Sequence, residues 1–405
     1  MALVVQKYGG TSVATPDLIR RVAERIVARH RNGDRMVVVV SAMGDTTDEL
    51  EALAAKVSSR PRDREMDMLM ASGERISMAL LAMAVNELGV EAVSMTGGQS
   101  GIITDAVHRK ARILDLKPDR LLEELEQGKI LIVAGFQGVT TEAEETTLGR
   151  GGSNLSAVAM AYALKADVCE MNTDVDGIYT ADPRVVQEAR KLEVITPEEM
   201  LELASAGARV LQSRSVEFAS KYGVVIAVRS SFTENPGTLI KEVEEMEEVV
   251  VRGIAHDLSD AKITLRQVSD RPGIAAQLFG SLAEHNINVD MIIQNTSEAG
   301  STDVSFTVQE SDLQRALEVC QAVKEDLGAA AVVSDLAIGK ISVVGVGMKS
   351  HAGVAASMFK ALAQAHINIH MISTSEIKIS CVVDQADTEN AVRVLHAAFG
   401  LEAAA

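Results

Sequence analysis

A repeated segment in the C-terminal part of the chain constrains the fold most strongly. Residues 272–292, PGIAAQLFGSLAEHNINVDMI, match residues 352–372, AGVAASMFKALAQAHINIHMI, and the identities fall on both the turn and the apolar side of the expected helix. Each copy follows an alternating strand and precedes more strand-like sequence and a second helix. The preceding strands are expected at 261–270 and 339–348, and the second helices at 313–327 and 389–399. This order predicts a ferredoxin-like βαββαβ unit that occurs twice.

The first 240 residues have a different pattern, in which short apolar runs alternate with amphipathic segments. The runs are continuous rather than alternating, which is typical of strands covered on both faces. They lie at 3–6, 36–42, 130–135, 168–171 and 224–228, and amphipathic helices are expected, for example, at 18–30 and 74–88. Strands that alternate with helices predict an α/β domain, with a mostly parallel central sheet between layers of helices.

A change in composition separates the two parts. The acidic stretch 241–250, KEVEEMEEVV, follows a turn and a short strand, and its charges fit either a linker or a solvated edge of a strand or helix. A chain of 405 residues is also too long for one ordinary core. We expect an α/β domain at 1–243, a linker with the first strand of the next region at 244–260, and repeat domains at 261–337 and 338–405.

Composition and charge exclude several classes of protein. The net charge of −18 opposes binding to nucleic acids, whose phosphates it would repel. The three cysteines lack the spacing of metal ligands and fit a reduced cytoplasm; they are Cys169, Cys320 and Cys381. The N-terminus does not resemble a signal peptide, and no apolar run approaches the roughly 18 residues of a membrane span. The sequence predicts a soluble cytoplasmic protein without a membrane partner, and its isolated histidines predict no catalytic metal site.

Two glycine-rich loops introduce helices in the α/β part. The first is QKYGGTS, residues 6–12, where paired glycines allow close approach of an anion and Lys7 adds positive charge. The second is TTLGRGGSN, residues 146–154, where Arg150 is suited to bind a carboxylate or phosphate through two parallel hydrogen bonds. Each loop alone also fits an ordinary tight turn. Two of them in one parallel-sheet domain point to a phosphorylated ligand.

A third segment, NTDVDGIYTADPR at residues 172–184, combines acidic and turn residues after a strand. Asp174, Asp176 and Asp182 are candidate Ca²⁺ or Mg²⁺ ligands, but the spacing is not that of an EF-hand. A loop facing a nucleotide, with Tyr179 against the base and Arg184 near the phosphates, fits the mixture better. A purely structural loop remains the alternative.

Together the motifs resemble those of aspartokinase. The resemblance rests on KYGGTSV, VVVVSAMGDTTDEL, ASGE, LGRGGS, TDVDGIYTADPRVV and VLQSRSVEFA, which occur in the family's order and spacing, and on a C-terminal repeat similar to paired ACT domains. It covers essentially the whole chain. It implies the amino-acid-kinase fold and ATP-dependent phosphorylation of the β-carboxylate of L-aspartate, a feedback-regulated first step toward lysine, threonine and methionine.

The resemblance also implies roles for individual residues. The catalytic set would be Lys7, Arg150 and Asn154. Aspartate would be held by Ser41, Thr47, Glu74, Arg150, Gly151, Gly152 and Ser153, with Glu74 near its amine. ATP, with Mg²⁺, would be held by Lys7, Gly9, Gly10, Thr173, Asp174, Tyr179, Asp182, Arg184, Arg209 and Val210. No dedicated protein metal site is implied.

Two positions depart from the family pattern. Asn154 stands where the family has an aspartate that is thought to orient the active-site lysine, and Asn172 stands where tyrosine is usual. Asparagine is nearly isosteric with aspartate but neutral, so it would hydrogen-bond a lysine without holding it by charge. Three interpretations follow: a working aspartokinase with a slower chemical step, a paralogue with another substrate, or a non-catalytic protein that senses amino acids.

The repeat implies regulation and assembly. By resemblance the effectors would be lysine, threonine or both. They would bind at Asp270, Ile274, Ala275, Asn288, Val289, Asp290, Gln294, Asn368, Ile369, Thr374, Ser375 and Glu376. The two copies differ where Asp290 corresponds to His370, which predicts non-equivalent sites. A homo-oligomer is expected through the ACT domains, and Met246 stands where an internal start would produce a separate regulatory subunit. The alternative is that the repeat serves only to dimerise the chain.

Overall fold

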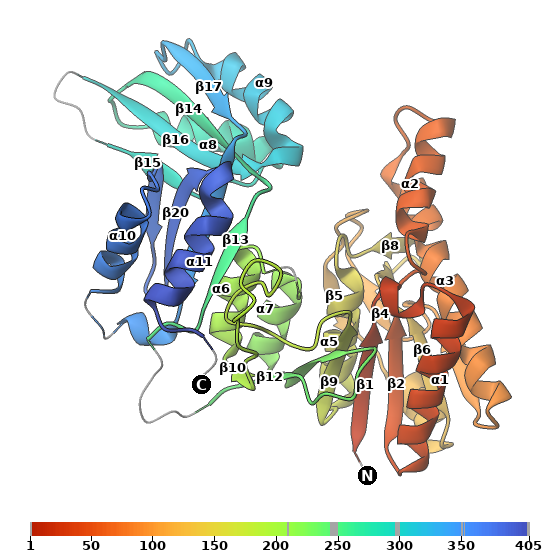
Figure 1. Cartoon of the computed structure of the whole chain (residues 1–405). Helices are drawn as coiled ribbons and strands as arrows, with labels where there is room; N and C mark the ends of the chain where they lie inside the picture. The colour runs from red at the N-terminus through yellow and green to blue at the C-terminus, as the bar shows by residue number, and fades with distance from the viewer. Residues whose placement is uncertain are drawn as a thin grey trace. The chain divides into compact units, whose positions relative to one another are not determined.

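The computed structural model describes residues 2–208, 210–243, 250–295, 300–349, 351 and 353–402. The chain divides into two compact units (Figure 1). Unit 1 comprises Met1–Ile178, Lys191–Ala204 and Arg209–Glu244, and unit 2 comprises Tyr179–Arg190, Ser205–Ala208 and Glu245–Ala405.

Unit 1 is built on an eight-stranded sheet in the order β10-β12-β11-β9-β1-β2-β6-β3. All neighbours in this sheet pair in parallel except β11 and β12, so the predicted mostly parallel sheet is confirmed. The strands are β1 Leu3–Tyr8, β2 Arg35–Val40, β3 Ala92–Met95, β6 Ile130–Ala134, β9 Val168–Thr173, β10 Val194–Ile195, β11 Ile226–Ser230 and β12 Thr238–Ile240. All five apolar runs singled out in the sequence are strands of this sheet.

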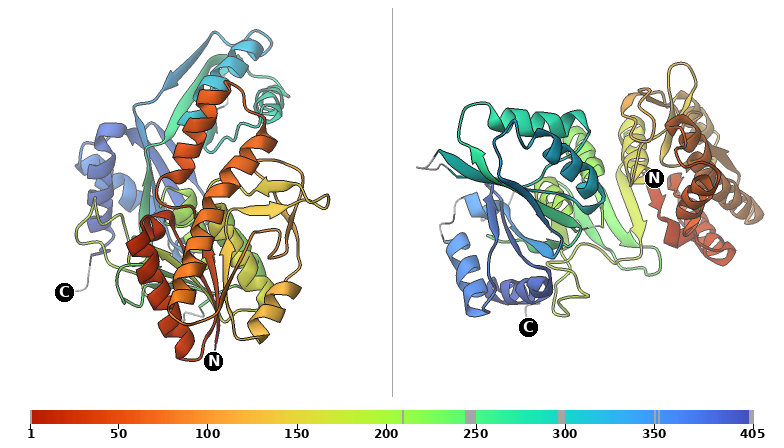
Figure 2. Two further views of the ribbon diagram at one scale, coloured as in Figure 1. Left: turned by 90° about the vertical axis from the view of Figure 1, so that its right-hand side faces the viewer. Right: turned by 90° about the horizontal axis from the view of Figure 1, so that it is seen from above.

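Helices cover both faces of the large sheet. Helices α1 (Pro16–Arg31) and α3 (Asp63–Glu87) lie side by side on one face (Figure 2), where their apolar residues share a core with Val4 and Tyr8 of β1. Helix α5 (Gly152–Leu164) contacts β1, β2 and β9, and α7 (Ser213–Tyr222) packs against α5. Because side chains alternate along a strand, Lys7 points to the opposite side of the sheet from Val4 and Tyr8.

A small second sheet of unit 1 was not anticipated from the sequence. Its order is β5-β4-β7-β8, and its strands are β4 Ile102–Thr104, β5 Ile113–Leu116, β7 Gln137–Val139 and β8 Glu145–Thr147. The remaining helical elements of this part of the chain are η1 Gly10–Val13, α2 Thr46–Val57, α4 Asp119–Glu126 and α6 Pro197–Ser205. The small sheet matters for function because β8 leads directly into the loop that contains Arg150.

Helix α3 corrects one expectation. Among the described residues it is the one helix with the length and apolar composition of a membrane span, although the sequence was expected to contain no such stretch. One face of α3 is buried in the unit, with Met66, Met70, Leu81 and Val85 among its buried residues. The core helix of a globular unit commonly has this character.

Unit 2 contains two four-stranded antiparallel sheets with helices on one side, as expected for paired ACT domains. The first sheet has the order β15-β16-β14-β17, and the second has the order β13-β18-β20-β19. The first domain consists of β14 Asp260–Ser269, α8 Ile274–Glu284, β15 Ile292–Gln294, β16 Ser301–Gln309, η2 Glu310–Asp312, α9 Leu313–Val323 and β17 Ala331–Asp335. The second consists of β18 Ile338–Val344, η3 Val346–Lys349, α10 Val354–Gln364, β19 Met371–Thr374, β20 Lys378–Asp384, η4 Gln385–Asp387 and α11 Thr388–Ala398.

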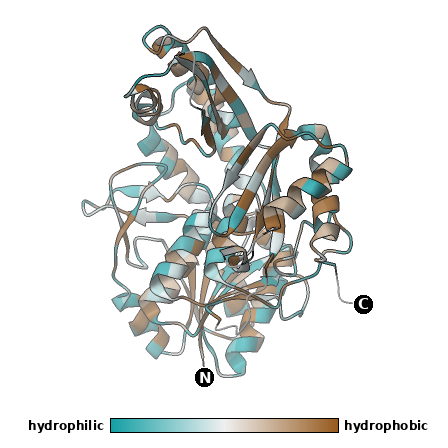
Figure 3. Ribbon diagram, turned by 90° about the vertical axis from the view of Figure 1, so that its left-hand side faces the viewer, coloured by the Kyte–Doolittle hydropathy of each residue, from teal (hydrophilic) through white to brown (hydrophobic). Residues whose placement is uncertain are grey.

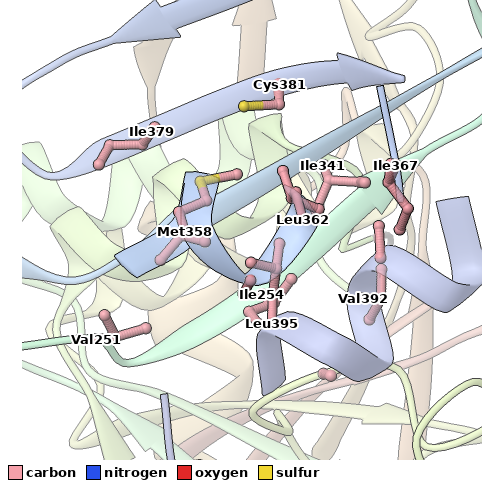
Figure 4. Packing of buried hydrophobic residues seen from close by; sticks show 14 of the residues in the cluster. Val251, Ile254, Ile341, Met358, Leu362, Ile367, Ile379, Cys381, Val392 and Leu395 are labelled. Atoms are coloured by element: carbon pink, nitrogen blue, oxygen red, sulfur yellow. The ribbon is translucent and has the colours of Figure 1, made fainter. Parts of the chain in front are cut away.

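The second ACT domain completes its sheet with a strand from elsewhere in the sequence. Strand β13 (Gly253–Asp257) precedes the first domain, yet it pairs with β18 and occupies the place that β17 has in the first sheet. Figure 4 shows the resulting core, in which Met358 and Leu362 of α10 and Leu395 of α11 pack against the strands. The helices carry both hydrophobic and hydrophilic residues, as helices with one buried face do (Figure 3).

Candidate active site

The candidate active site lies at the carboxyl edge of the large sheet of unit 1. Strands β1, β2 and β6 all end at this edge, because they pair in parallel. Ligands of open parallel sheets bind outside the carboxyl ends of the strands. Both glycine loops expected from the sequence begin or end here.

Lys7 supplies positive charge near the end of β1. A Cβ atom on Gly9 would lie 3.3 Å from Nζ of Lys7, so the ammonium group sits directly beside the glycine loop. Burial lowers the pKa of Lys7 to about 8, and the charge of Asp174 opposes this effect. The amine therefore remains largely protonated at neutral pH and can neutralise an anion at this position.

The loop after β1 has room only for glycine at one position. A Cβ atom on Gly10 would lie 2.9 Å from the carbonyl oxygen of Ala42 and 3.1 Å from that of Gly44. The N–H of Gly44 donates to the carbonyl of Gly10 at 3.1 Å, which fixes the loop after β2 against the loop after β1. The N–H of Gly9 donates to the carbonyl of Asn172 at 3.3 Å and links the loop to β9.

Glu74 is a buried carboxyl group with one unsatisfied oxygen. It lies on α3 with 5% of its surface exposed, and Oε1 accepts a hydrogen bond from the N–H of Ala42 at 3.2 Å. Oε2 is buried and has no partner among the described residues. Burial raises the pKa of Glu74 to about 7. Such an oxygen suits a hydrogen-bond donor from a ligand, and a cationic donor would suit it best.

Ser41 and Thr47 lie in the segment that follows β2, which contacts α3 near Glu74. The carbonyl of Ser41 accepts a hydrogen bond from the hydroxyl of Ser77 on α3 at 2.6 Å. Thr47 is half-buried in the first turn of α2. Both therefore belong to the segment between β2 and α3 that faces the same edge.

The Arg150 loop connects β8 to the start of α5. Gly149 (φ 81°) and Gly151 (φ 70°) adopt left-handed backbone conformations on either side of the exposed Arg150, which favours glycine at both positions. A Cβ atom on Gly135 would lie 2.9 Å from both Oγ of Ser153 and the carbonyl of Val40. The start of α5 thus lies at the ends of β2 and β6, where the positive end of the helix dipole can attract an anion.

Asn154 does not hold Lys7 in this structure. Its N–H donates to the carbonyl of Gly151 at 3.0 Å, within the first turn of α5. In the described part of the chain, neither its side chain nor the ammonium group of Lys7 has a hydrogen-bonding partner. No hydrogen bond joins the two groups in the residues that the structure describes.

Of the residues expected to bind ATP, unit 1 brings together only some. The hydroxyl of Thr173 donates to Asp174 at 3.0 Å after β9, and the carbonyl of Thr173 accepts from the N–H of Ser231 at 2.7 Å. Val210 is half-buried. Arg209, like Met246, lies outside the described residues.

Tyr179, Asp182 and Arg184 belong to unit 2 instead. Arg184 forms an ion pair with Asp182 at 2.6 Å, and this contact lowers the pKa of Asp182. The surrounding segment packs into the second ACT domain, where the carbonyl of Thr180 accepts from the N–H of Ile254 at 2.7 Å. These three residues therefore belong to a different unit from Lys7.

Several residues that shape the site were missed from the sequence. The most prominent is Asp67, a fully buried carboxylate on α3 that binds His108, Arg109 and Thr147. A signal was present, because an aspartate among apolar residues lies two helical turns before Glu74 on the same helix face. Gln212 was also missed; its side chain donates to the carbonyl of Arg150.

The expected effector residues are mostly exposed in unit 2. Asp270, Ala275, Asn288, Asp290, Gln294, Asn368, Thr374, Ser375 and Glu376 are exposed, Val289 and Ile369 are half-buried, and Ile274 is buried. Asp290 has a protein partner that was not anticipated, because its carboxylate lies 2.5 Å from Nζ of Lys340. Its counterpart His370 pairs with Asp384 at 2.9 Å. The two positions therefore have different surroundings.

Comparisons with known proteins agree with this architecture. Residues 2–230 match the amino acid kinase family, and residues 263–323 and 341–399 match an ACT domain. The aspartokinase of Mycolicibacterium smegmatis is 53% identical over 99% of this chain and 97% of its own length. The chain belongs to the aspartokinase family. The interpretation as an aspartate kinase with ACT regulatory domains is thereby confirmed.

Other relatives extend the comparison. The aspartokinase of Corynebacterium glutamicum is also 53% identical, over 99% of this chain and 97% of its own length. The structure of E. coli aspartokinase III in complex with aspartate and ADP, in the R-state, is 27% identical with a TM-score of 0.83, and the match covers 98% of this aspartokinase and 99% of that chain. The same enzyme in complex with lysine and aspartate, in the T-state, has a TM-score of 0.76 at 27% identity and the same coverage.

Proposed function

We propose that this aspartate kinase binds aspartate between Glu74 and the Arg150 loop, and the phosphates of ATP between Lys7 and the loop of Gly9 and Gly10. The observation that carries this proposal is the meeting of both glycine loops with a buried, unsatisfied carboxyl oxygen at one sheet edge. That oxygen matches the ammonium group of an amino acid. Arg150 matches its α-carboxylate through two parallel hydrogen bonds.

The reaction needs no strong general base. A substrate carboxylate with a pKa of about 3.9 is already ionised at neutral pH and can attack phosphorus directly. The protein must reduce the repulsion between two anions and hold the attacking oxygen in line with the phosphoryl group. Lys7 and the positive end of the α5 helix dipole serve the first task. Glu74, Ser41, Thr47 and the segment Arg150–Ser153 serve the second.

Mg²⁺ would be carried mainly by the nucleotide. No group of three potential metal ligands occurs within the described ranges, and Mg²⁺ typically binds through substrate phosphates with one or two carboxylates. Asp174 is exposed, and its charge acts on Lys7. Its carboxylate is therefore suited to be the protein ligand of a nucleotide-bound Mg²⁺. The bound ion would neutralise phosphate charge. Thr173 and Val210 complete the part of the proposed nucleotide set that lies in unit 1. Tyr179, Asp182 and Arg184, expected from the sequence to bind ATP, belong to unit 2, and Arg209 lies outside the described residues.

Asn154 is compatible with activity in this scheme. Because Lys7 is flanked by Gly9 and attracted by Asp174, its position does not depend on a residue at 154 alone. We infer a working enzyme whose lysine is held more loosely than a carboxylate at 154 would hold it.

The ACT domains are proposed to bind lysine, threonine or both at the exposed residues named above. The lysine complex of E. coli aspartokinase III supports lysine as an effector class. Inhibition requires that the effector bind an inactive arrangement more tightly than the active one. A homo-oligomer formed through these domains is part of the proposal, as is a cytoplasmic location, which suits three buried free cysteines.

The test is formation of an acyl phosphate, trapped as the hydroxamate, with Mg-ATP and a panel of amino acids. We expect turnover with aspartate, inhibition by lysine or threonine, and a rise of at least about tenfold in the KM for aspartate in Arg150→Lys, since a planar bidentate contact is lost. A KM for aspartate that stays unchanged in Arg150→Lys would contradict the assigned binding mode while leaving the activity intact.

A further inference from the structure

Asp67 occupies an environment that demands an explanation. It is fully buried, and a buried carboxylate is costly unless it is paired and hydrogen-bonded. Four contacts satisfy it. Oδ1 accepts from the hydroxyl of Thr147 at 2.6 Å and from the N–H of Arg109 at 3.0 Å, and Oδ2 lies 3.1 Å from that N–H and 2.7 Å from Nδ1 of His108.

These contacts join the end of β8, just before the Arg150 loop, to the turn between β4 and β5. Thr147 is the last residue of β8, and Arg109 lies in the turn between β4 and β5. The N–H of Ala111 donates to the carbonyl of Thr147 at 2.9 Å. A Cβ atom on Gly149 would lie 2.9 Å from the carbonyl of Arg109. The chain on either side of Thr147 is thus packed against the turn that Asp67 holds.

A cation on another helix forms hydrogen bonds to the backbone of the same two segments. Arg214, on α7, donates through Nη1 to the carbonyl of Leu148 at 2.9 Å and through Nη2 to that of Ala111 at 2.8 Å. An anion from α3 and a cation from α7 therefore hold the backbone that leads into Gly149 and Arg150. Within the described ranges, neither Asp67 nor Arg214 shares a hydrogen bond with Lys7, Glu74 or Arg150.

The position of Asp67 on α3 gives this arrangement a functional meaning. Asp67 and Glu74 are seven residues apart, which places them on one face of the helix about 10 Å apart along its axis. One rigid helix thus carries the carboxylate proposed to bind the substrate amine and the carboxylate that anchors the Arg150 loop. The helix therefore sets the distance between Glu74 and the anchor of the Arg150 loop.

We propose that Asp67 is a positioning residue that sets aspartate affinity by fixing the Arg150 loop relative to Glu74. This inference rests on the proposed roles of Arg150 and Glu74. It assigns the effect to aspartate and not to ATP, because Lys7 and the Gly9 loop are attached to β1 and β9 and, among the residues that the structure describes, share no hydrogen bond with Asp67.

Two adjacent threonines of β8 provide a matched test. Thr147 bonds Asp67, whereas Thr146 is equally buried and bonds the hydroxyl of Thr104 at 2.6 Å. Neighbouring side chains of a strand point to opposite faces. Thr147→Val and Thr146→Val each delete one buried hydroxyl hydrogen bond, but only Thr147→Val removes a contact of Asp67.

We expect Thr147→Val to raise the KM for aspartate by roughly tenfold, the loss typical of one hydrogen bond to a charged group, and to change the KM for ATP by less than about twofold. Thr146→Val should leave both constants within about twofold. Asp67→Asn should raise the KM for aspartate less than Asp67→Ala, because the amide oxygen still accepts from Arg109 and Thr147. Thermal unfolding checks that each variant is folded.

Equal effects of the two threonine variants, or equal changes in the KM for aspartate and for ATP, would show a purely structural role and overturn the proposal. Arg150→Lys separates this failure from failure of the proposed binding mode. If Arg150→Lys raises the KM for aspartate and Thr147→Val does not, the positioning role of Asp67 alone is wrong. If Arg150→Lys has no effect, the proposed binding mode is wrong, and the positioning role that rests on it is wrong as well.

Discussion

Lys340 and Asp260 form a buried ion pair that joins the two ACT domains, with 2.7 Å between Nζ and Oδ2. Lys340 lies on β18 of the second domain, and Asp260 begins β14 of the first. Asp290 provides a second carboxylate for the same ammonium group. Burial and neighbouring carboxylates raise the pKa of Asp260 despite the opposing charge of Lys340. Two anions thus depend on one buried cation.

The first prediction concerns this ion pair. Lys340→Met should lower the free energy of unfolding of the regulatory unit by about 3–5 kcal/mol, because removal of one partner leaves buried charge uncompensated. Urea unfolding at neutral pH measures the loss. Lys262→Met is the control, since Lys262 occupies the matching position in the first repeat, is half-buried and is expected to cost less than about 1 kcal/mol. Equal losses in both variants would contradict a special role for Lys340.

The second prediction is a bell-shaped pH dependence. Glu74 must be ionised to bind the substrate amine, so kcat/KM for aspartate should rise with pH through about 7. Lys7 must be protonated to bind phosphate, so kcat/KM for ATP should fall as pH rises through about 8. Profiles measured with each substrate varied in turn separate the two limbs. An acidic limb centred near the ordinary glutamate value of 4.5 would show that Glu74 is not the group concerned.

The third prediction is that the buried carboxylate of Glu74 lowers the free energy of unfolding when it is ionised. Its pKa in the folded state lies above the ordinary value of 4.5, so the ionised form is disfavoured by folding. The resulting cost is absent at low pH, grows between about 4.5 and 7, and is constant above that range. At pH 8, Glu74→Gln should therefore raise the free energy of unfolding by about 1–3 kcal/mol while impairing activity.

Unfolding curves at pH 4 and pH 8 measure this effect. Glu87→Gln, at the exposed end of the same helix, is the matched control and should change stability little at either pH. A Glu74→Gln variant that is less stable than the wild type at pH 8 would mean that the ionised carboxylate is well satisfied in the fold.

The fourth prediction concerns Asn154. A carboxylate at this position would attract the ammonium group of Lys7, so Asn154→Asp should shift the alkaline limb of the ATP profile to higher pH. We also expect kcat to rise by up to about tenfold, a change of 1.4 kcal/mol in the barrier. Asn154→Ala, which removes the amide without adding charge, should produce neither change. An alkaline limb that stays at the same pH in Asn154→Asp would show that residue 154 does not act through Lys7.

Much of the fold was predictable because its signals are local. Continuous apolar runs identified five strands of the large sheet, and the repeat identified both ACT domains. The position of the Gly9 loop at the carboxyl edge follows from its place directly after a parallel strand. The Arg150 loop instead follows β8 of the small sheet, so its arrival at the same edge did not follow from the sequence. The strands of the small sheet have only three or four residues, too few for a periodic pattern to register.

What escaped prediction depends on contacts between distant residues. Strand β13 completes the second ACT sheet from a position before the first domain, although the repeat alone looks self-contained. The segment around Thr180 joins unit 2 through partners more than 70 residues further along the chain. The partners of Asp67 lie 41, 42 and 80 residues away. Hydrophobic periodicity carries no information about such pairings.

The most direct test of the account compares aspartate with succinate, which lacks only the ammonium group, in the wild type and in Glu74→Gln. The measured quantity is kcat/KM for hydroxamate-trapped acyl phosphate. If Glu74 binds the amine, the substitution should lower kcat/KM for aspartate by about tenfold or more, as expected for a lost charge-assisted hydrogen bond. It should leave the much slower reaction of succinate nearly unchanged. An equal loss with both substrates would contradict the placement of aspartate between Glu74 and the Arg150 loop.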